Sequence, residues 1–193
     1  QTMLTPDIHA AYTQGIERLS GHAAVQCLAS GQQGVASNTC QPQLFSARAS
    51  DFLTDETLQQ EVFGAASLII ECEGLEEMQR VAESLEGQLT ATLHMDEGDM
   101  GAAQSLLPIL ETKAGRILVN GWPTGVEVCH AMVHGGPFPA TSDSRTTSVG
   151  SAAIRRFLRP VCYQNFPDAL RPHALKEANP YRLHRLLDGE REA

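Results

Sequence analysis

The hydrophobic positions predict alternating helices and strands up to about residue 120. A first helix begins at Thr5, where a hydroxyl cap is followed by a proline at the first helical position and an acidic residue. Apolar residues then recur at the spacing of one helical face, at Ile8, Tyr12, Ile16 and Leu19. Strands are expected at residues 25–28, 43–48 and 66–72. The last of these is apolar throughout, as in a strand that is covered on both faces.

The middle of the chain continues this alternation. We expect a helix over residues 74–86, a strand over 88–95, a further helix and then a strand over 115–120. The second helix should be capped by Asp99 and run to about Leu110, although Pro108 should end or bend it early. Such an order of strands and helices is typical of an α/β sheet with crossover helices.

The regular pattern stops after residue 120. Residues 121–148 hold three prolines, four glycines and a tail rich in serine and threonine. An irregular run of this length is typical of a functional loop. Beyond it, the pattern predicts a short helix at 154–158, an extended segment at 160–166 and a last helix at 179–187.

Composition narrows the class of protein. The chain has 193 residues, and 14 Lys and Arg against 23 Asp and Glu give a net charge of −9. An acidic chain is a poor partner for nucleic acid, and no apolar run approaches the length of a membrane span. The opening residues hold no basic stretch followed by an apolar one, so we expect a cytoplasmic protein.

The cysteines and histidines give weak signals. Five cysteines, none in a CxxC pair, predict reduced thiols rather than a disulfide framework or a zinc cage. His130 and His134 have the spacing of two metal ligands on a helix, but Ala131 stands where a zinc hydrolase has glutamate. We therefore expect no metal. Cys129 and His130 form a nucleophile–base pair in composition only, because neighbours in an extended chain point to opposite faces.

The sequence lacks a phosphate-binding motif but contains a candidate contact for the ribose and ring of a nucleotide. Neither of the glycine-rich phosphate-binding motifs occurs, and the pair Gly135-Gly136 is followed by prolines that lack N–H donors. In Glu61-Val62-Phe63-Gly64, however, an acid and an aromatic ring two residues apart share one side of an extended chain. This pair could hold a ribose hydroxyl and cover a flat ring. The alternative is an acid that precedes a strand and a phenylalanine of the core.

Four segments, taken in order, resemble the C-terminal part of an aldehyde dehydrogenase. They are Glu61-Val62-Phe63-Gly64, Leu89-Thr90-Ala91-Thr92-Leu93, Ala114-Gly115-Arg116-Ile117-Leu118-Val119-Asn120 and Gly136-Pro137-Phe138. Residues 120–128 and 134–143 resemble a narrower branch, which oxidises 2-oxoglutarate semialdehyde (2,5-dioxopentanoate) with NADP. The resemblance extends over nearly the whole chain.

The resemblance assigns five site residues. It implies that Glu61 holds the nicotinamide ribose of NADP and that Phe63 lies beside the nicotinamide. It also implies that Trp122, Val126 and Phe138 line the tunnel for a small aldehyde substrate. We expect the reaction of the family, in which the aldehyde adds to a cysteine, a hydride passes to the cofactor and the thioester is hydrolysed.

The implied fold is α/β, a mostly parallel sheet with flanking helices. Residues 1–167 would form the C-terminal part of the catalytic domain, and residues 159–167 within it would be an oligomerisation strand. Residues 168–193 would be a C-terminal tail. A homo-oligomer assembled through residues 159–167 is therefore expected.

Two departures from the family pattern stand out. Ala65 replaces a frequent proline after the Glu-x-Phe-Gly run. The widespread Pro-Phe-Gly-Gly-x-Lys loop is replaced by Pro-Phe-Pro-Ala-Thr-Ser, a change that fits the narrower branch.

Three features of the family are missing. The family nucleophile precedes threonine, whereas the five cysteines here precede Leu, Gln, Glu, His and Tyr. The general-base motif Glu-Leu-Gly-Gly and the dinucleotide domain are also absent. We therefore expect a C-terminal portion of an enzyme that has no catalytic residue, is inactive alone and does not bind NADP tightly. The alternatives are a stand-alone binding or assembly module, a Cys129-dependent hydrolase and a dehydrogenase of another aldehyde, such as a fatty one.

Overall fold

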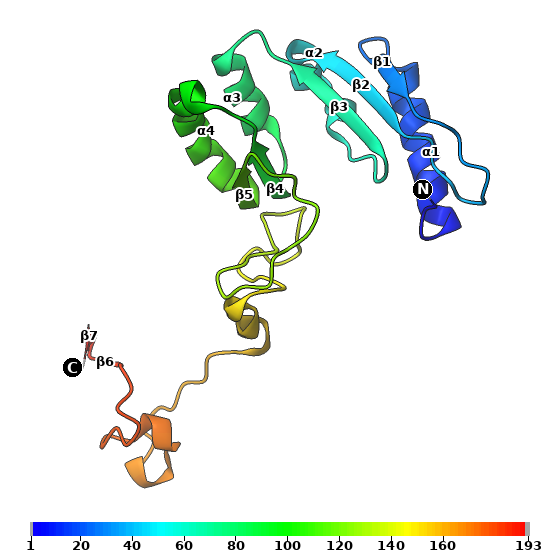
Figure 1. The fold of residues 1–193 in the computed structure, drawn as a ribbon. Coiled ribbons are helices and arrows are strands. Elements are labelled where there is room, and N and C mark those ends of the chain that lie inside the picture. The colour runs from blue at the N-terminus through cyan, green and yellow to red at the C-terminus, as the bar shows by residue number, and fades with distance from the viewer. Residues whose placement is uncertain (1, 192–193) are drawn as a thin grey trace. The chain divides into compact units, whose positions relative to one another are not determined.

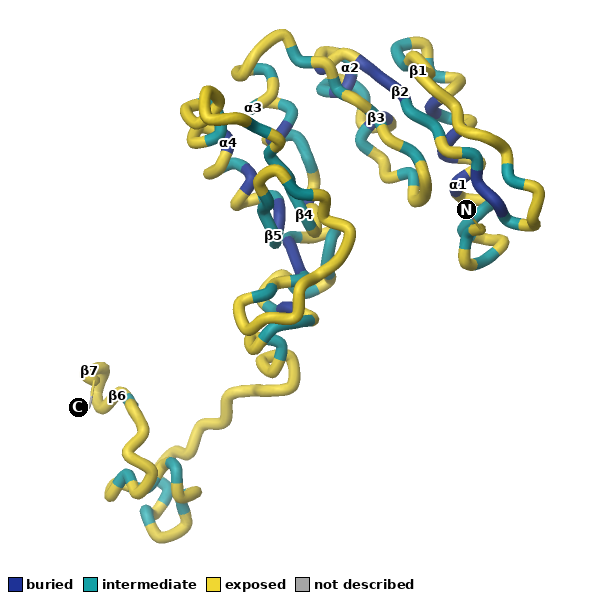
Figure 2. The backbone as a smooth tube through the Cα atoms, in the orientation of Figure 1, coloured by how far each residue is buried: buried dark blue, intermediate teal, exposed yellow. Residues whose placement is uncertain are grey.

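A computed structural model describes residues 2–191 of the chain (Figure 1). The chain divides into two compact units, one that ends at Arg156 and one that begins at Phe157. Buried residues belong to the first unit, and none of the described residues of the second unit is buried (Figure 2). Among the described residues, no helix is both long and apolar enough to cross a membrane.

The first unit begins with a helix and a three-stranded sheet. Helix α1 (Pro6–Gly21) starts as expected at Thr5, whose side-chain oxygen accepts a hydrogen bond from the Ile8 amide at 3.2 Å. The strands follow in the order β1 (Gln26–Ser30), β2 (Gln43–Arg48) and β3 (Ala66–Glu71). Strand β1 is antiparallel to β2, and β3 is parallel to β2. Between β2 and β3 lie the short helix α2 (Ala49–Thr54) and the 3-10 turn η1 (Glu56–Gln59).

A core between α1 and this sheet holds the unit together. Its buried side chains come mainly from α1, β2 and α2, and Phe45 of β2 is completely buried. Leu68 and Ile70 of β3 pack against this core, whereas Ile69 and the other alternate residues of β3 are exposed. The described chain therefore covers one face of β3, although the apolar sequence of this strand predicts cover on both.

The next elements build a second, smaller sheet. Helix α3 (Leu75–Ser84) leads to β4 (Gln88–Leu93), and α4 (Met100–Lys113) crosses over to β5 (Ala114–Val119), which is parallel to β4. The short turn η2 (Glu97–Asp99) precedes α4. The expected alternation is present, but β3 and the β4–β5 pair belong to separate sheets.

Helix α4 begins directly after Asp99, as expected, but it continues past Pro108 and beyond Leu110. It runs through Pro108 to Lys113, because Leu106 and Leu110 are buried in the second core and Lys113 donates to the Leu85 carbonyl at 2.7 Å. Tertiary packing therefore outweighs the hydrogen bond that proline removes. The Asp99 side chain does not cap α4. It accepts from the Asp96 amide instead, as part of a capping box around η2.

The remainder of the chain contains little regular structure. Residues 121–150 are irregular, as expected, and are followed by the 3-10 helix η3 (Ser151–Phe157). The second unit has two 3-10 turns, η4 (Asp168–Leu170) and η5 (His173–Leu175), and a hairpin of β6 (Leu186–Leu187) and β7 (Glu190–Arg191).

The prediction of a helix over residues 179–187 is wrong. Asn179 and Arg182 have positive φ, and the Asn179 side chain bonds both main-chain groups of Leu183 in a turn.

Candidate functional site

The run Glu61-Val62-Phe63-Gly64 lies just before β3 and presents alternate side chains to opposite sides. Val62 points inward, where it packs against the first core and fits closely over Gly15. Glu61 is exposed, and Phe63 keeps 66% of its surface exposed. Phe63 is therefore not a core residue. The Glu61 carboxylate makes no hydrogen bond or ion pair with any described residue, so the acid and the ring are both open to a ligand.

Tyr12 of α1 holds this run in place, a role that the sequence analysis missed. Its hydroxyl lies 2.6 Å from the Gln41 carbonyl and 3.3 Å from the Ala65 carbonyl, so it can donate to either. A side chain on Gly64, where φ is 154°, would collide with the Tyr12 ring. Burial, and secondarily the nearby Cys40, raises the pKa of Tyr12, so its hydroxyl stays a donor. A tyrosine within an otherwise aliphatic stripe was the available signal, because a buried hydroxyl needs a partner.

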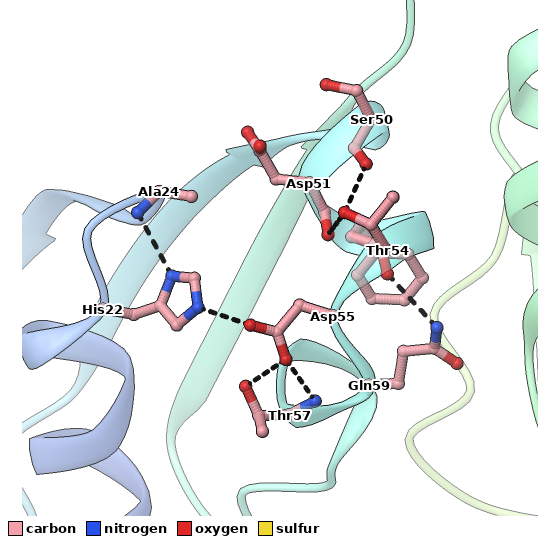
Figure 3. Close-up of polar contacts among 9 residues, drawn as sticks. His22, Ala24, Ser50, Asp51, Thr54, Asp55, Thr57 and Gln59 are labelled. Carbon is pink, nitrogen blue, oxygen red and sulfur yellow. Dashed lines mark hydrogen bonds and ion pairs between the residues drawn. The ribbon is translucent and has the colours of Figure 1, made fainter.

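A histidine–aspartate contact fixes the turn that leads into this run (Figure 3). His22 Nε2 lies 2.9 Å from an Asp55 carboxylate oxygen, and His22 Nδ1 accepts from the Ala24 amide at 3.1 Å. The ring proton is therefore on Nε2, which donates to Asp55. The other carboxylate oxygen of Asp55 accepts from the amide and the hydroxyl of Thr57. Hydrogen bonds from Thr57, followed by those from His22, lower the pKa of Asp55 from 3.8 to about 2.

The predicted aldehyde-tunnel residues follow β5. Trp122 keeps 78% of its surface exposed and packs against the His94 ring, with 4.8 Å between ring centroids. Asn120, two residues earlier, has positive φ and bonds both main-chain groups of Met95. Trp122 is thus anchored next to the ends of β4 and β5. Neither Asn120 nor His94 was among the predicted site residues.

Arg116 of β5 fixes the path of the loop around Val126. One terminal nitrogen of its guanidinium donates to the Gly125 carbonyl at 2.7 Å and lies 4.0 Å from the Met132 sulfur. Its Nε is buried and has no partner among the described atoms. Val126 follows Gly125 directly and is partly exposed. The position of this predicted tunnel residue therefore depends on a charged side chain from the neighbouring strand.

Phe138 lies where the loop returns to the starts of β4 and β5. Its carbonyl accepts from the Gly87 amide at 3.2 Å, and its side chain keeps 80% of its surface exposed. The contact is main chain against main chain, because a Cβ on Gly87, Gly115 or Gly136 would collide with backbone oxygens across it. Small residues at these positions allow the loop to lie directly on the sheet.

The structure does not build a metal or cysteine site from the residues around Cys129. His130 bonds the Ser151 hydroxyl at 2.6 Å, and no hydrogen bond joins the Cys129 thiol to a described residue. Cys129 is exposed. Within residues 2–191, no three His, Cys, Asp or Glu side chains converge as metal ligands.

The predicted site residues therefore fall into two groups. Glu61 and Phe63 precede β3, whereas Trp122, Val126 and Phe138 belong to the loop after β5. No hydrogen bond, ion pair or ring contact links the two groups within residues 2–191.

Comparison with solved structures defines the class of fold. The chain superposes on betaine aldehyde dehydrogenase from Staphylococcus aureus with a TM-score of 0.63 and 14% identity, over 81% of this chain and 29% of that one. It superposes on delta-pyrroline-5-carboxylate dehydrogenase from Mycobacterium tuberculosis with a TM-score of 0.62 and 18% identity, over 89% and 31%. The fold is thus that of part of an aldehyde dehydrogenase. No family model matches the chain.

Sequence comparison places the chain more narrowly. It is 55% identical to alpha-ketoglutaric semialdehyde dehydrogenase 2 from Azospirillum brasilense, over 98% of this chain and 36% of the relative. It is 50% identical to alpha-ketoglutaric semialdehyde dehydrogenase from Acinetobacter baylyi over the same shares. This similarity confirms the resemblance of the sequence to the C-terminal part of an aldehyde dehydrogenase, and the chain spans about a third of the length of these relatives.

Proposed function

We propose that the protein to which this chain belongs oxidises 2-oxoglutarate semialdehyde (2,5-dioxopentanoate) to 2-oxoglutarate, with NADP as the oxidant. The observation that carries the proposal is the 55% identity, over 98% of the chain, to a relative named for this activity. In the reaction, the aldehyde and water give the carboxylate, and the cofactor gains a hydride while protons pass to solvent. The nicotinamide ring supplies the hydride acceptor when the cofactor is bound.

Glu61 and Phe63 are the proposed cofactor contacts. The open Glu61 carboxylate can accept hydrogen bonds from the two hydroxyls of the nicotinamide ribose. Phe63 offers an exposed aromatic face two residues away, on the same side of the extended chain. The Tyr12 hydroxyl and the close fit at Gly64 hold both residues in position. These residues therefore fit a nicotinamide riboside.

Trp122, Val126 and Phe138 are the proposed wall of the aldehyde passage. All three are apolar and exposed, and each is anchored by its backbone or its neighbours to the β4–β5 pair. Apolar side chains can exclude water from a reacting aldehyde and from the thioester that follows. In this proposal they orient the substrate and take no part in proton transfer.

The proposal gives this chain no catalytic residue and no tight cofactor site of its own. It also retains residues 1–167 as part of the catalytic domain and residues 168–193 as a tail. Residues 159–167 would join a second subunit, which is supported by an extended segment with exposed Val161 and Tyr163. This segment pairs with no strand among residues 2–191.

Separating the two Michaelis constants in the full-length protein tests the two proposed groups. Glu61→Gln should raise the KM for NADP about tenfold and leave the KM for the aldehyde within about twofold, because it weakens only the ribose contact. Phe138→Ala should raise the KM for the aldehyde about tenfold and leave the KM for NADP within about twofold. Glu56→Gln, an exposed acid on η1, and Phe157→Ala, with 82% of the ring exposed, are the matched controls. Equal effects on both constants, or none, would contradict the assignment.

A further inference from the structure

A cavity of about 390 Å³ lies in the first unit, a volume within the range of small-molecule sites. Its wall includes Leu89 of β4, Arg156 of η3, His134 and several residues of the range 140–148. The loop is held in place here, because the amide and the hydroxyl of Ser148 both donate to the His134 carbonyl at 3.1 Å. The five residues proposed to contact cofactor or aldehyde are all described by the structure, and none of them lines this cavity.

Arg156 supplies a positive charge at the wall of the cavity. Asp143 also lines the cavity, but its carboxylate is held by Arg145, whose Nε and one terminal nitrogen lie 3.0 and 3.2 Å from the two oxygens. Hydrogen bonds from Arg145, and more weakly the charge of Arg156, lower the pKa of Asp143. Arg156 is thus near this pair, yet it makes no hydrogen bond or ion pair with any described residue. Its guanidinium is therefore open to an anion.

Other groups on the wall narrow the kind of anion. The Ser142 hydroxyl makes no hydrogen bond with a described residue, so it can donate to a ligand. The Nδ1 atom of His134 is buried and has no partner among the described atoms. Buried polar atoms almost always have a partner, so this nitrogen points to a further hydrogen-bonding group at the wall. Leu89 adds an apolar side chain that is 37% exposed. The combination suits an oxyanion on a carbon chain better than a bare inorganic ion.

We propose that this cavity binds the carboxylate group of a small organic acid. Arg156 holds the carboxylate, the Ser142 hydroxyl donates a further hydrogen bond, and Leu89 packs against the carbon chain. A ligand held in this way links η3 to β4 and to the loop that follows β5. This inference goes beyond the proposed function, because it concerns a cavity that the cofactor and aldehyde residues do not line and does not depend on which aldehyde is oxidised.

Chemical modification of arginine tests the proposal directly. Phenylglyoxal modifies accessible guanidinium groups, and mass spectrometry of the full-length protein locates the modified residues. Glutarate, a five-carbon dicarboxylate, is the probe, and at saturation it should slow the modification of Arg156 at least about fivefold. Arg155 is the matched control, because it is exposed on the same 3-10 helix and is not part of the cavity wall. Its modification should change by less than about twofold.

Three results of this experiment would overturn the proposal. Equal protection of Arg155 and Arg156, or protection of neither, would mean that glutarate does not bind in the cavity. Protection of Arg156 by inorganic phosphate but not by glutarate would assign the cavity to a bare anion. An Arg156 that does not react in the full-length protein without added acid would mean that another part of that protein covers the cavity. All three readouts are independent of dehydrogenase activity.

Direct binding gives a second test. In calorimetric titration of the full-length protein with glutarate, Arg156→Gln should raise the dissociation constant at least about tenfold, because it removes the charge that holds the carboxylate. Arg155→Gln removes the same charge from the neighbouring position and should change the constant by less than about twofold. Both side chains are exposed, so neither substitution should unfold the protein. An unchanged constant for Arg156→Gln, or equal losses in the two variants, would overturn the proposal.

Discussion

The side-chain amide of Asn120 bonds both the N–H and the C=O of Met95, each at 2.8 Å. The main-chain N–H of Asn120 also donates to the Leu93 carbonyl at 2.9 Å. This one residue therefore joins the C-terminal ends of β4 and β5 by hydrogen bonds. Its φ of 53° lies in the left-handed region, which asparagine tolerates better than most residues. The start of the loop that carries Trp122 is therefore fixed by hydrogen bonds of the sheet rather than by the loop itself.

We expect Asn120→Ala to destabilise the first unit by about 2 kcal/mol. The substitution removes two hydrogen bonds and places alanine at positive φ. Urea unfolding followed by tryptophan fluorescence measures this effect selectively, since Trp122 is the only tryptophan. Asn179→Ala is the matched control, because Asn179 makes the same two-sided bond in the second unit. A control variant that destabilises the first unit equally would contradict this role of Asn120.

Gly64→Ala should destabilise the chain by more than about 2 kcal/mol. The new methyl group meets the ring of Tyr12, and alanine is strained at this backbone conformation. Gly101→Ala provides the comparison, since nothing lies near its added methyl group in α4 and alanine favours a helix by about 1 kcal/mol. Denaturant unfolding of the two variants should therefore give effects of opposite sign, and two small effects of the same sign would contradict the close fit at Gly64.

The Asp55 contact predicts a pH dependence at the acid end. Because the pKa of Asp55 is lowered from 3.8 to about 2 in the folded chain, its ionised form favours folding above about pH 4. That contribution is lost as the pH falls from about 4 to about 2. The difference in free energy of unfolding between the native chain and Asp55→Asn should thus be constant above pH 4 and shrink below it. A difference that grows as the pH falls would show the opposite sign of coupling.

Fluorescence tests the contact between His94 and Trp122. The imidazole covers part of one face of an indole that is otherwise largely exposed. His94→Ala should increase the rate at which a neutral quencher such as acrylamide collides with Trp122. His184→Ala, an exposed histidine of the second unit, should leave quenching unchanged. If His94→Ala behaved like this control, the ring contact would not exist in solution.

Sequence patterns predicted the elements whose local signals agree with their tertiary packing. The Thr5 cap, the apolar stripe of α1 and the strands β2 to β5 are all present close to the expected residues. Predictions from local sequence were wrong where the tertiary structure imposed a different backbone conformation. Two buried leucines carry α4 past Pro108, and positive φ at Asn179 produces a turn where spacing predicted a helix.

The candidate site was only partly accessible from the sequence. The exposure of Glu61 and Phe63 agrees with the ligand-binding interpretation of their spacing, but spacing could not show that Tyr12 holds them from 49 or more residues away in the chain. Likewise, the bond from Arg116 to Gly125 depends on how the loop folds back over β5. Such long-range contacts have no signature in local periodicity.

In the proposed function, this chain forms one wall of an aldehyde dehydrogenase site whose reactive thiol lies elsewhere in the full-length protein. The most direct test is the rate of NADPH formation from 2-oxoglutarate semialdehyde by the purified 193-residue chain and by the full-length protein. We expect turnover by the full-length protein and none by the chain alone. Thiol-dependent NADPH formation by the chain alone would show instead that these 193 residues hold a complete catalytic site.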